Sequence, residues 1–180
     1  STDKYLLGID SIRVSNLALD DVAVSQPRLS EYTAIPFEQA GTYFPSLIVT
    51  NQGVNSASGV SVSCSVTDFI GNTVYTATMS GSSTIAPGAS VTFNDGGSGF
   101  SPPAQIDLYT ASFQVSINQN DIVPENDTAS IQLFISDSLY ARDEAVSNSQ
   151  VEGSLGIGTG ATGILGNNYT INSPTEAVGI

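Results

Sequence analysis

The side chains that most often perform catalysis are scarce in this chain. It contains no histidine, which excludes Ser-His-Asp triads, Cys-His pairs and histidine-ligated metal sites. The single cysteine, Cys64, lies among the valines of an alternating segment, which predicts a buried, inert thiol rather than a nucleophile. The glycine-rich residues 156–163 lack the lysine of a phosphate-binding loop. Most acidic residues lie in predicted loops without flanking aromatic residues, which argues against a glycosidase pair. We therefore predict no catalytic residue.

One oxygen-rich loop is the best candidate for a metal site. Its side chains offer the hard oxygen ligands that Ca²⁺ takes, although their spacing is not that of an EF-hand. The candidate ligands are Asn118, Asn120, Asp121, Glu125 and Asp127. The alternative is an Asx-rich turn, in which these side chains bond their own backbone. Apart from calcium, no cofactor is expected.

Aromatic residues in predicted loops are the only candidates for a sugar-binding platform. Tryptophan is absent, and most Tyr and Phe residues fall on core-facing strand positions. The loop aromatics are Tyr32, Phe37, Phe69 and Phe100. They either form a platform or plug the ends of the core, and the second role is the commoner one in β-sandwiches.

The elements that position these residues are strands. Residues 60–67 and 109–117 alternate strictly between apolar side chains and hydroxyl or amide side chains. This pattern predicts antiparallel strands with one buried and one wet face. It places six side chains in the core: Val62, Cys64, Val66, Ala111, Phe113 and Val115.

Weaker strand signals fill the remaining length at regular intervals. They cover residues 21–25, 43–50, 73–79, 90–93 and 130–135, with turn residues between them. Seven short strands with frequent turns predict an all-β, Ig-like or fibronectin-III-like Greek-key antiparallel sandwich over residues 17–137. Tyr109 opens the penultimate strand, where such sandwiches keep a tyrosine corner. We expect its hydroxyl to bond the connecting backbone.

The two ends of the chain do not fit inside this domain. Residues 1–16 contain a strand-like segment ahead of the sandwich. Residues 138–180 are rich in Gly, Ser, Asn and Thr and hold too few large apolar groups for a core of their own. Both flanks are expected to pack outside the sandwich, as pieces of neighbouring domains. A flexible tail is the alternative for residues 138–180.

Composition limits the class of partner. Lys and Arg total 4 against 17 Asp and Glu, so the net charge is −13. Such a surface repels nucleic acid, whose binding relies on cationic side chains. No apolar run reaches the roughly 20 residues of a membrane span. Only 12% of residues are charged, well below the roughly one quarter usual in globular domains, and this composition is typical of a secreted protein.

Four segments, in order, resemble CARDB-type domains, the cell-adhesion-related modules of bacterial surface proteins. Residues 43–53 resemble a strand ending in V-x-N-x-G, residues 85–93 an L-A-P-G-x-S-x-T hairpin, and residues 109–115 a Y-x5-V strand. Residues 121–130 are similar to the D-x3-E-x-N-x-T-x-S approach to the final strand, with Asn126-Asp127 where the family often has paired asparagines. The resemblance implies an Ig-like, non-catalytic module.

The flanks carry further resemblances. Residues 5–14 look like the closing strand of a jelly-roll domain, and residues 140–158 look like the opening of another β-sandwich. Proteins with this architecture typically use type IX secretion and act as adhesins or multidomain peptidases. This implies a location outside, or on the surface of, a Gram-negative bacterium. Three Asp-Ser/Thr-apolar sites resemble the O-glycosylation acceptors of such proteins: Ser11, Thr128 and Ser138.

The resulting interpretation is a spacer and interaction module of a multidomain surface protein. Its expected partners are the neighbouring domains of the same polypeptide and surface glycans or proteins. The alternatives are a carbohydrate-binding module and an accessory domain of a secreted hydrolase or peptidase, whose catalytic residues would lie in other parts of the protein.

Overall fold

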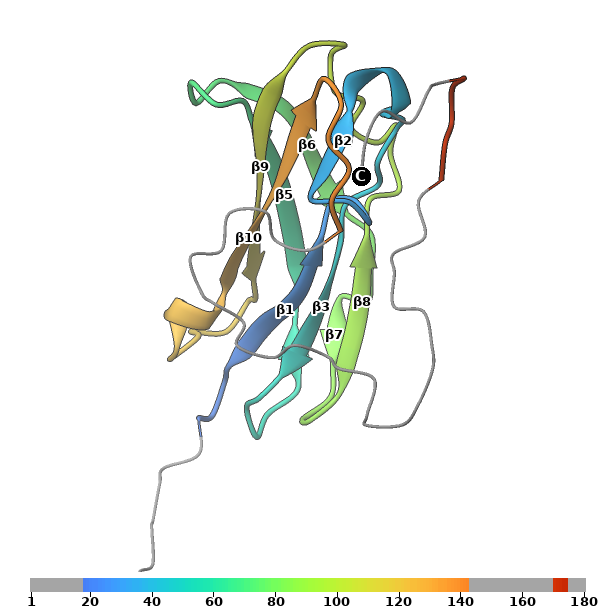
Figure 1. Ribbon diagram of the computed structural model, residues 1–180. Helices are drawn as coiled ribbons and strands as arrows, with labels where there is room; N and C mark the ends of the chain where they lie inside the picture. Colours follow the sequence, from blue (N-terminus) through green and yellow to red (C-terminus); the bar gives the residue numbers. More distant parts are fainter. Residues whose placement is uncertain (1–17, 143–169, 175–180) are drawn as a thin grey trace, which may run out of the picture.

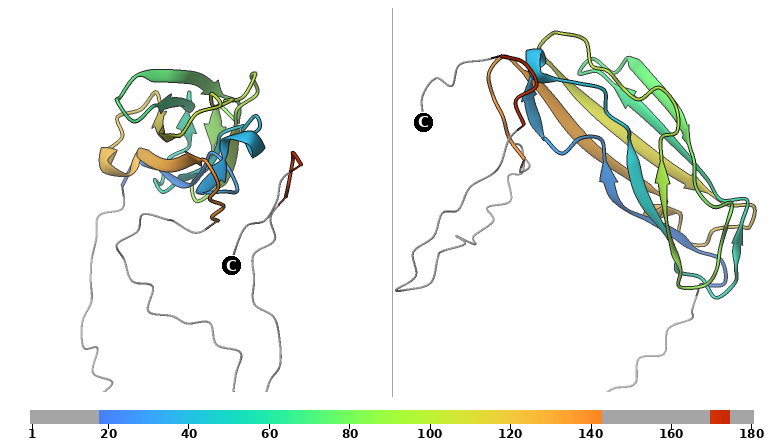
Figure 2. Two further views of the ribbon diagram at one scale, coloured as in Figure 1. Left: turned by 45° about the horizontal axis from the view of Figure 1, so that its top comes forward. Right: turned by 90° about the vertical axis from the view of Figure 1, so that its right-hand side faces the viewer.

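Alternating strands build two main sheets that pack face to face (Figures 1 and 2). The computed structural model describes residues 18–142 and 170–174. The three-stranded sheet has the order β1 (Val22–Arg28), β3 (Ser46–Asn51), β8 (Ser90–Asn94). The five-stranded sheet has the order β2 (Ala34–Pro36), β10 (Thr128–Ser136), β9 (Asp107–Ser116), β5 (Ser61–Thr67), β6 (Thr73–Met79). A small third sheet pairs β4 (Ala57–Ser58) with β7 (Thr84–Ile85).

The core lies between the two main sheets and has the composition that the alternation predicts. All six side chains placed in the core from the sequence are 0–2% exposed. Leu47, Val49 and Phe93 face them from the three-stranded sheet and are equally buried. Their strand neighbours Ser63, Ser112 and Gln114 are exposed. The predicted register of β5 and β9 is therefore confirmed, since a slip by one residue would have inverted every side chain.

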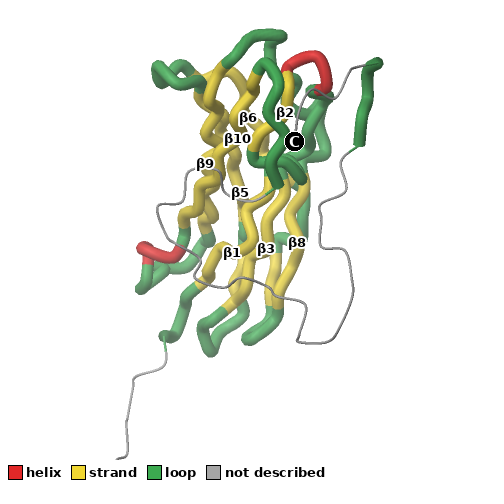
Figure 3. Tube along the Cα trace, viewed as in Figure 1, coloured by secondary structure: helices red, strands yellow, loops and turns green. Residues whose placement is uncertain are grey.

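The all-β fold class is confirmed, and each of the seven predicted strands is present with small shifts at its ends. Strands β2, β4 and β7, which have only two or three residues each, were not predicted. Nor was the pairing of β2 with β10, which is parallel in an otherwise antiparallel sheet. Within the described part of the chain, helix is limited to the 3-10 turns η1 (Phe37–Gln39) and η2 (Pro124–Asn126), drawn red in Figure 3.

The sandwich keeps contacting the chain beyond residue 137, where the sequence analysis placed its end. Ala141 forms an antiparallel bridge with Ala34, and its carbonyl accepts hydrogen bonds from the N–H groups of Thr33 (2.9 Å) and Ala34 (3.2 Å). Residues 170–174 also lie against the sandwich, through Gln39 and Tyr32. The strand expected within residues 1–16, the candidate acceptor Ser11 and most of residues 143–180 lie outside the described residues.

Candidate functional site

Cys64 is a core residue. Its side chain is 2% exposed on β5, paired with Ala77 of β6 and Phe113 of β9. Burial, with a smaller contribution from the charge of Asp95, raises the pKa of the thiol to about 12. The thiol therefore stays protonated at neutral pH and is a poor nucleophile, in agreement with the role predicted from the sequence.

The candidate calcium loop separates into two places. Asn118 lies beside β4, where its backbone N–H donates to the carbonyl of Ser58 (2.9 Å). A Cβ atom at Gly59, whose φ is +62°, would overlap the Asn118 side-chain amide, so a larger residue there would require this amide to move. Asn120 and Glu125 are exposed. Asp121 and Asp127 approach each other on the other side of the loop, next to Asp21.

Asp121 has the geometry of the Asx-turn alternative. One carboxylate oxygen accepts from its own backbone two residues on, at Val123 N–H (2.8 Å), and the other accepts from Val22 N–H (2.8 Å) at the start of β1. Among the described residues, no three His, Cys, Asp or Glu side chains converge closely enough to hold a metal ion. Asp121 thus adopts the Asx-turn geometry, and calcium binding stays a prediction.

Asp127 and Asp21 add to the negative charge of this loop. Burial and the charges of Asp121, Asp21 and Glu125 raise the pKa of Asp127 to about 6. One of its carboxylate oxygens is buried without a hydrogen-bond partner among the described residues. Asp21, which the sequence analysis did not single out, is 5% exposed and accepts a hydrogen bond from the Asn126 side chain (3.0 Å). In the sequence it stood only as the first residue of the predicted strand over residues 21–25.

The loop aromatics do not form a sugar-binding platform. Tyr32 and Phe100 are 8% and 2% exposed, and Phe37 packs against the core. Phe69 alone is exposed, at the tip of the β5–β6 hairpin. Three of the four therefore plug the core, as the second of the two alternatives predicted.

Tyr109 is architectural, but not through the expected bond. It is 1% exposed, and its ring meets that of Phe100 edge-to-face at 5.1 Å. Its hydroxyl has no hydrogen-bond partner among the described residues. The polar link between the sheets comes instead from Tyr75 of β6, whose hydroxyl donates to the carboxylate of Asp95 after β8. Burial and this acceptor raise the pKa of Tyr75 to about 12.

The outer side of the five-stranded sheet is the candidate surface for binding. Apart from the apolar Val74, Leu108 and Phe134 near the strand ends, its outward side chains on β5, β6, β9 and β10 carry a hydroxyl or an amide. We call this set the hydroxyl face: Ser61, Ser63, Ser65, Thr67, Thr76, Thr78, Thr110, Ser112, Gln114, Ser116, Thr128, Ser130 and Gln132. None of these side chains is charged, in a chain whose net charge is −13.

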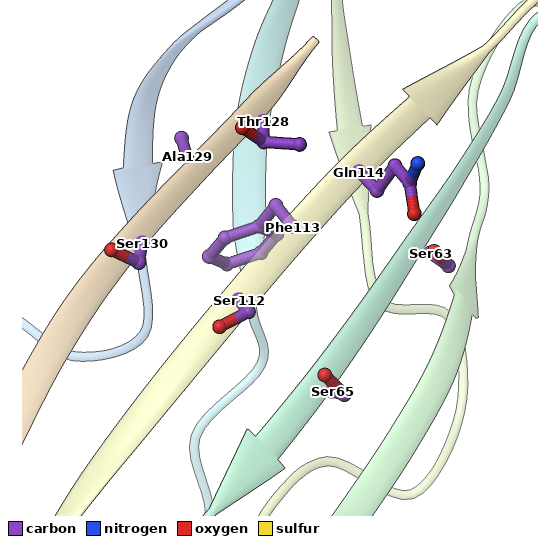
Figure 4. A pocket seen from close by; sticks show the side chains of 8 residues that line it. All are labelled: Ser63, Ser65, Ser112, Phe113, Gln114, Thr128, Ala129 and Ser130. Carbon is purple, nitrogen blue, oxygen red and sulfur yellow. The ribbon is translucent and has the colours of Figure 1, made fainter. Parts of the chain in front are cut away.

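Strand register arranges the hydroxyl face in rows that cross the sheet. Ser65 pairs with Thr76 on one side and with Ser112 on the other, and Ser112 pairs in turn with Ser130. With strands about 4.8 Å apart, such a row is about 14 Å long. The serines leave a shallow depression of about 620 Å³ over β5, β9 and β10, bordered by Gln114 and Thr128 (Figure 4).

The two described candidates for O-glycosylation are accessible. Thr128 is exposed as the first residue of β10, at the border of this depression. Ser138 is exposed, and its hydroxyl donates to the carboxylate of Asp137 (3.0 Å). Accessibility is required of an acceptor, and their glycosylation stays a prediction.

Comparison with known proteins finds likeness at the level of the fold. No family model and no curated protein matches the chain. A CARDB domain from Pyrococcus furiosus, crystallised in complex with di-metal ions, aligns at 18% identity and a TM-score of 0.44, covering 71% of this chain and 99% of that one. A solution structure of a CARDB domain from the same organism aligns at 12% identity and a TM-score of 0.42, over 68% of this chain and 99% of that one. A putative ApaA protein from Bordetella pertussis aligns at 18% identity and a TM-score of 0.39, over 67% of this chain and 93% of that one.

Proposed function

We propose that the chain is a non-catalytic structural and adhesion module, which acts as a spacer and interaction domain in a secreted, multidomain protein of the bacterial surface. The observation that carries this proposal is the path of the chain. Residues 18–20 lie at one end of the sandwich, beside the turn after β3, and residues 136–142 lie toward the other end (Figure 2). Strand β10 alone spans about 27 Å. A domain entered at one end and left near the other separates its neighbours along one axis.

The chemistry of the described residues supports a role without catalysis. The buried Cys64 thiol is protonated at neutral pH, and no cluster of three His, Cys, Asp or Glu side chains that could hold a metal ion is found in residues 18–142 and 170–174. No helix of the described residues is long and apolar enough to cross a membrane. An interaction module needs only accessible surface, and the hydroxyl face offers an extended one.

The location is tested on intact cells of the source organism. Antibodies raised against the chain should label cells without permeabilisation, and the full-length gene should encode further domains on both sides. Labelling that appears only after permeabilisation would contradict the proposal.

The hydroxyl face favours one alternative, a carbohydrate-binding module for neutral glycans. Each Ser or Thr hydroxyl both donates and accepts hydrogen bonds, as sugar hydroxyls do, and the absence of charge gives phosphates and uronates nothing to pair with. Because no exposed aromatic ring lies in the depression, affinity should be weak, with a Kd of about 1 mM. On a multivalent glycan array, neutral glycans should retain the chain.

The matched variants for this test lie on the two sheets. Ser112→Lys fills the middle of the hydroxyl face and should abolish retention. Thr92→Lys places the same charge at an exposed position on β8 of the other sheet and should leave retention unchanged. Absence of retention by any glycan removes this alternative and leaves the spacer function standing.

A further inference from the structure

The strongest polar cluster outside the hydroxyl face joins two parts of the chain that are far apart in sequence. Gln39, at the end of η1, is 2% exposed. Its side-chain oxygen accepts hydrogen bonds from the backbone N–H groups of Asn172 (2.7 Å) and Ser173 (2.9 Å). Its side-chain nitrogen donates to the carbonyl of Ser173 (2.9 Å). Both polar atoms of the Gln39 side chain thus form hydrogen bonds to the backbone of residues 172 and 173.

Two further hydrogen bonds extend this contact. The side-chain amide of Asn172 donates to the backbone carbonyl of Gln39 (2.9 Å), and the hydroxyl of Tyr32 accepts from the backbone N–H of Thr170 (2.9 Å). Three of the partners in residues 170–173 are backbone N–H groups and one is a carbonyl, which any sequence supplies. Asn172 adds the one side-chain contact that depends on residue type. This division between backbone affinity and side-chain specificity is typical of extended-peptide recognition.

The sandwich holds both recognition residues in place. Tyr32 packs edge-to-face on Tyr140 at 5.9 Å, and the guanidinium of Arg142 lies 5.1 Å from the centre of its ring. Gln39 follows β2 directly through η1, and β2 is fixed on one side by β10 and on the other by Ala141. The strand that precedes Gln39 is therefore held by backbone pairing that does not involve residues 170–174.

We propose that Tyr32 and Gln39 form a binding site for an extended peptide, and that residues 170–174 of the same chain are its resident occupant. The contact anchors this segment next to β2. This inference is independent of the proposed adhesive function, because it depends only on the contacts of Tyr32 and Gln39. Five hydrogen bonds must offset the ordering of a mostly exposed segment, so the contact opens more readily than the core.

Amide hydrogen exchange of the full chain, followed by NMR, tests this site. In the wild type, the amides of Thr170, Asn172 and Ser173 should exchange at least about 10-fold more slowly than in an unstructured peptide. Gln39→Ala should return Asn172 and Ser173 to the unprotected rate. Gln119→Ala is the matched control, because Gln119 makes a similar pair of bonds, to the backbone of Ser56 (3.0 Å) and Ser58 (3.1 Å), elsewhere on the sandwich. It should leave residues 170–173 protected.

A second variant tests the same site if the Gln39→Ala protein does not fold. Ser173→Pro removes one donating N–H from the segment, leaves the sandwich unaltered, and should release Asn172 as well. Unprotected amides at 172 and 173 in the wild type, or protection that survives both variants, would overturn the site. Protection that rises with protein concentration would overturn the assignment to the same chain, since a second copy would then supply the segment.

Discussion

Asp127 carries a charge that the folded protein tolerates poorly at neutral pH. Its pKa is about 6 in the fold and about 3.9 in an unfolded chain. Between these values the native state holds a proton that the unfolded state has released, so the proton stabilises the native state at low pH. This stabilisation is lost as the pH rises through about 6.

Asp127→Asn should therefore stabilise the protein at pH 7. We expect a gain of about 1 kcal/mol in the free energy of unfolding, a figure reduced for solvent screening of a partly exposed group. The gain should disappear below about pH 4, where the wild-type carboxyl is protonated in both states. Urea denaturation at pH 4 and pH 7 measures both values, with Glu125→Gln as the control for an exposed charge in the same loop. A variant less stable than the wild type at pH 7 would contradict this account.

The thiol of Cys64 should report global unfolding. Because the side chain is buried in the core and its pKa is about 12, a thiol reagent such as DTNB should not label the native chain at pH 8 within hours. In denaturing urea the same reagent should label it completely, because the exposed thiolate fraction is then that of an ordinary cysteine. Rapid stoichiometric labelling in native buffer would show that β5 opens locally.

At the scale of the elements, two neighbouring residues of β9 should differ strongly in how much they contribute to stability, because one faces the core and the other faces solvent. Phe113 is 1% exposed and Gln114 is exposed on the hydroxyl face. Phe113→Ala should lower the free energy of unfolding by about 3–5 kcal/mol, because it removes a large buried side chain and leaves a cavity. Gln114→Ala should change it by about 0.5 kcal/mol or less. Denaturation midpoints measure both, and similar losses would contradict the register of β9.

The elements also show which parts of the fold the sequence could predict. Strands β5 and β9 are long enough for alternation to set their register and to reveal the composition of the hydroxyl face. Strands β2, β4 and β7 are too short to carry any period, so nothing local marks them. The depression in the hydroxyl face depends on how β10, β9 and β5 align, which is a long-range property.

The side-chain hydrogen bonds could not be predicted from the sequence either, because they too depend on long-range alignment of the chain. Tyr75 and Asp95 are 20 residues apart, and Gln39 and Asn172 are 133 residues apart. A hydrogen bond between single side chains leaves no periodic trace in either partner. The burial of Tyr109 could be predicted from the alternation of its strand, and it is confirmed. The hydrogen bond expected from its hydroxyl could not be predicted in this way, and no partner for it is found among the described residues.

At the scale of the whole molecule, the structured unit extends past the boundary at residue 137 that strand patterns indicate. Ala141 pairs with Ala34 through three backbone hydrogen bonds that involve Thr33 and Ala34, two of them 2.9 Å long. Tyr140 packs on Tyr32, and Arg142 forms an ion pair with Glu31 at 3.1 Å. These contacts hold the edge of the five-stranded sheet at β2.

A fragment ending at residue 137 should therefore be less stable than one ending at residue 142. Without residues 138–142, β2 keeps only its parallel pairing with β10, and Tyr32 loses its aromatic neighbour. Three hydrogen bonds at about 1 kcal/mol each are worth roughly 10 °C in melting temperature for a domain of this size. Thermal melts of residues 18–137, residues 18–142 and the full chain measure this, with the last two expected to melt within a few degrees of each other. Equal melting temperatures for the two fragments would place the boundary at residue 137 after all, because the contacts of Tyr140, Ala141 and Arg142 would then contribute nothing to the fold.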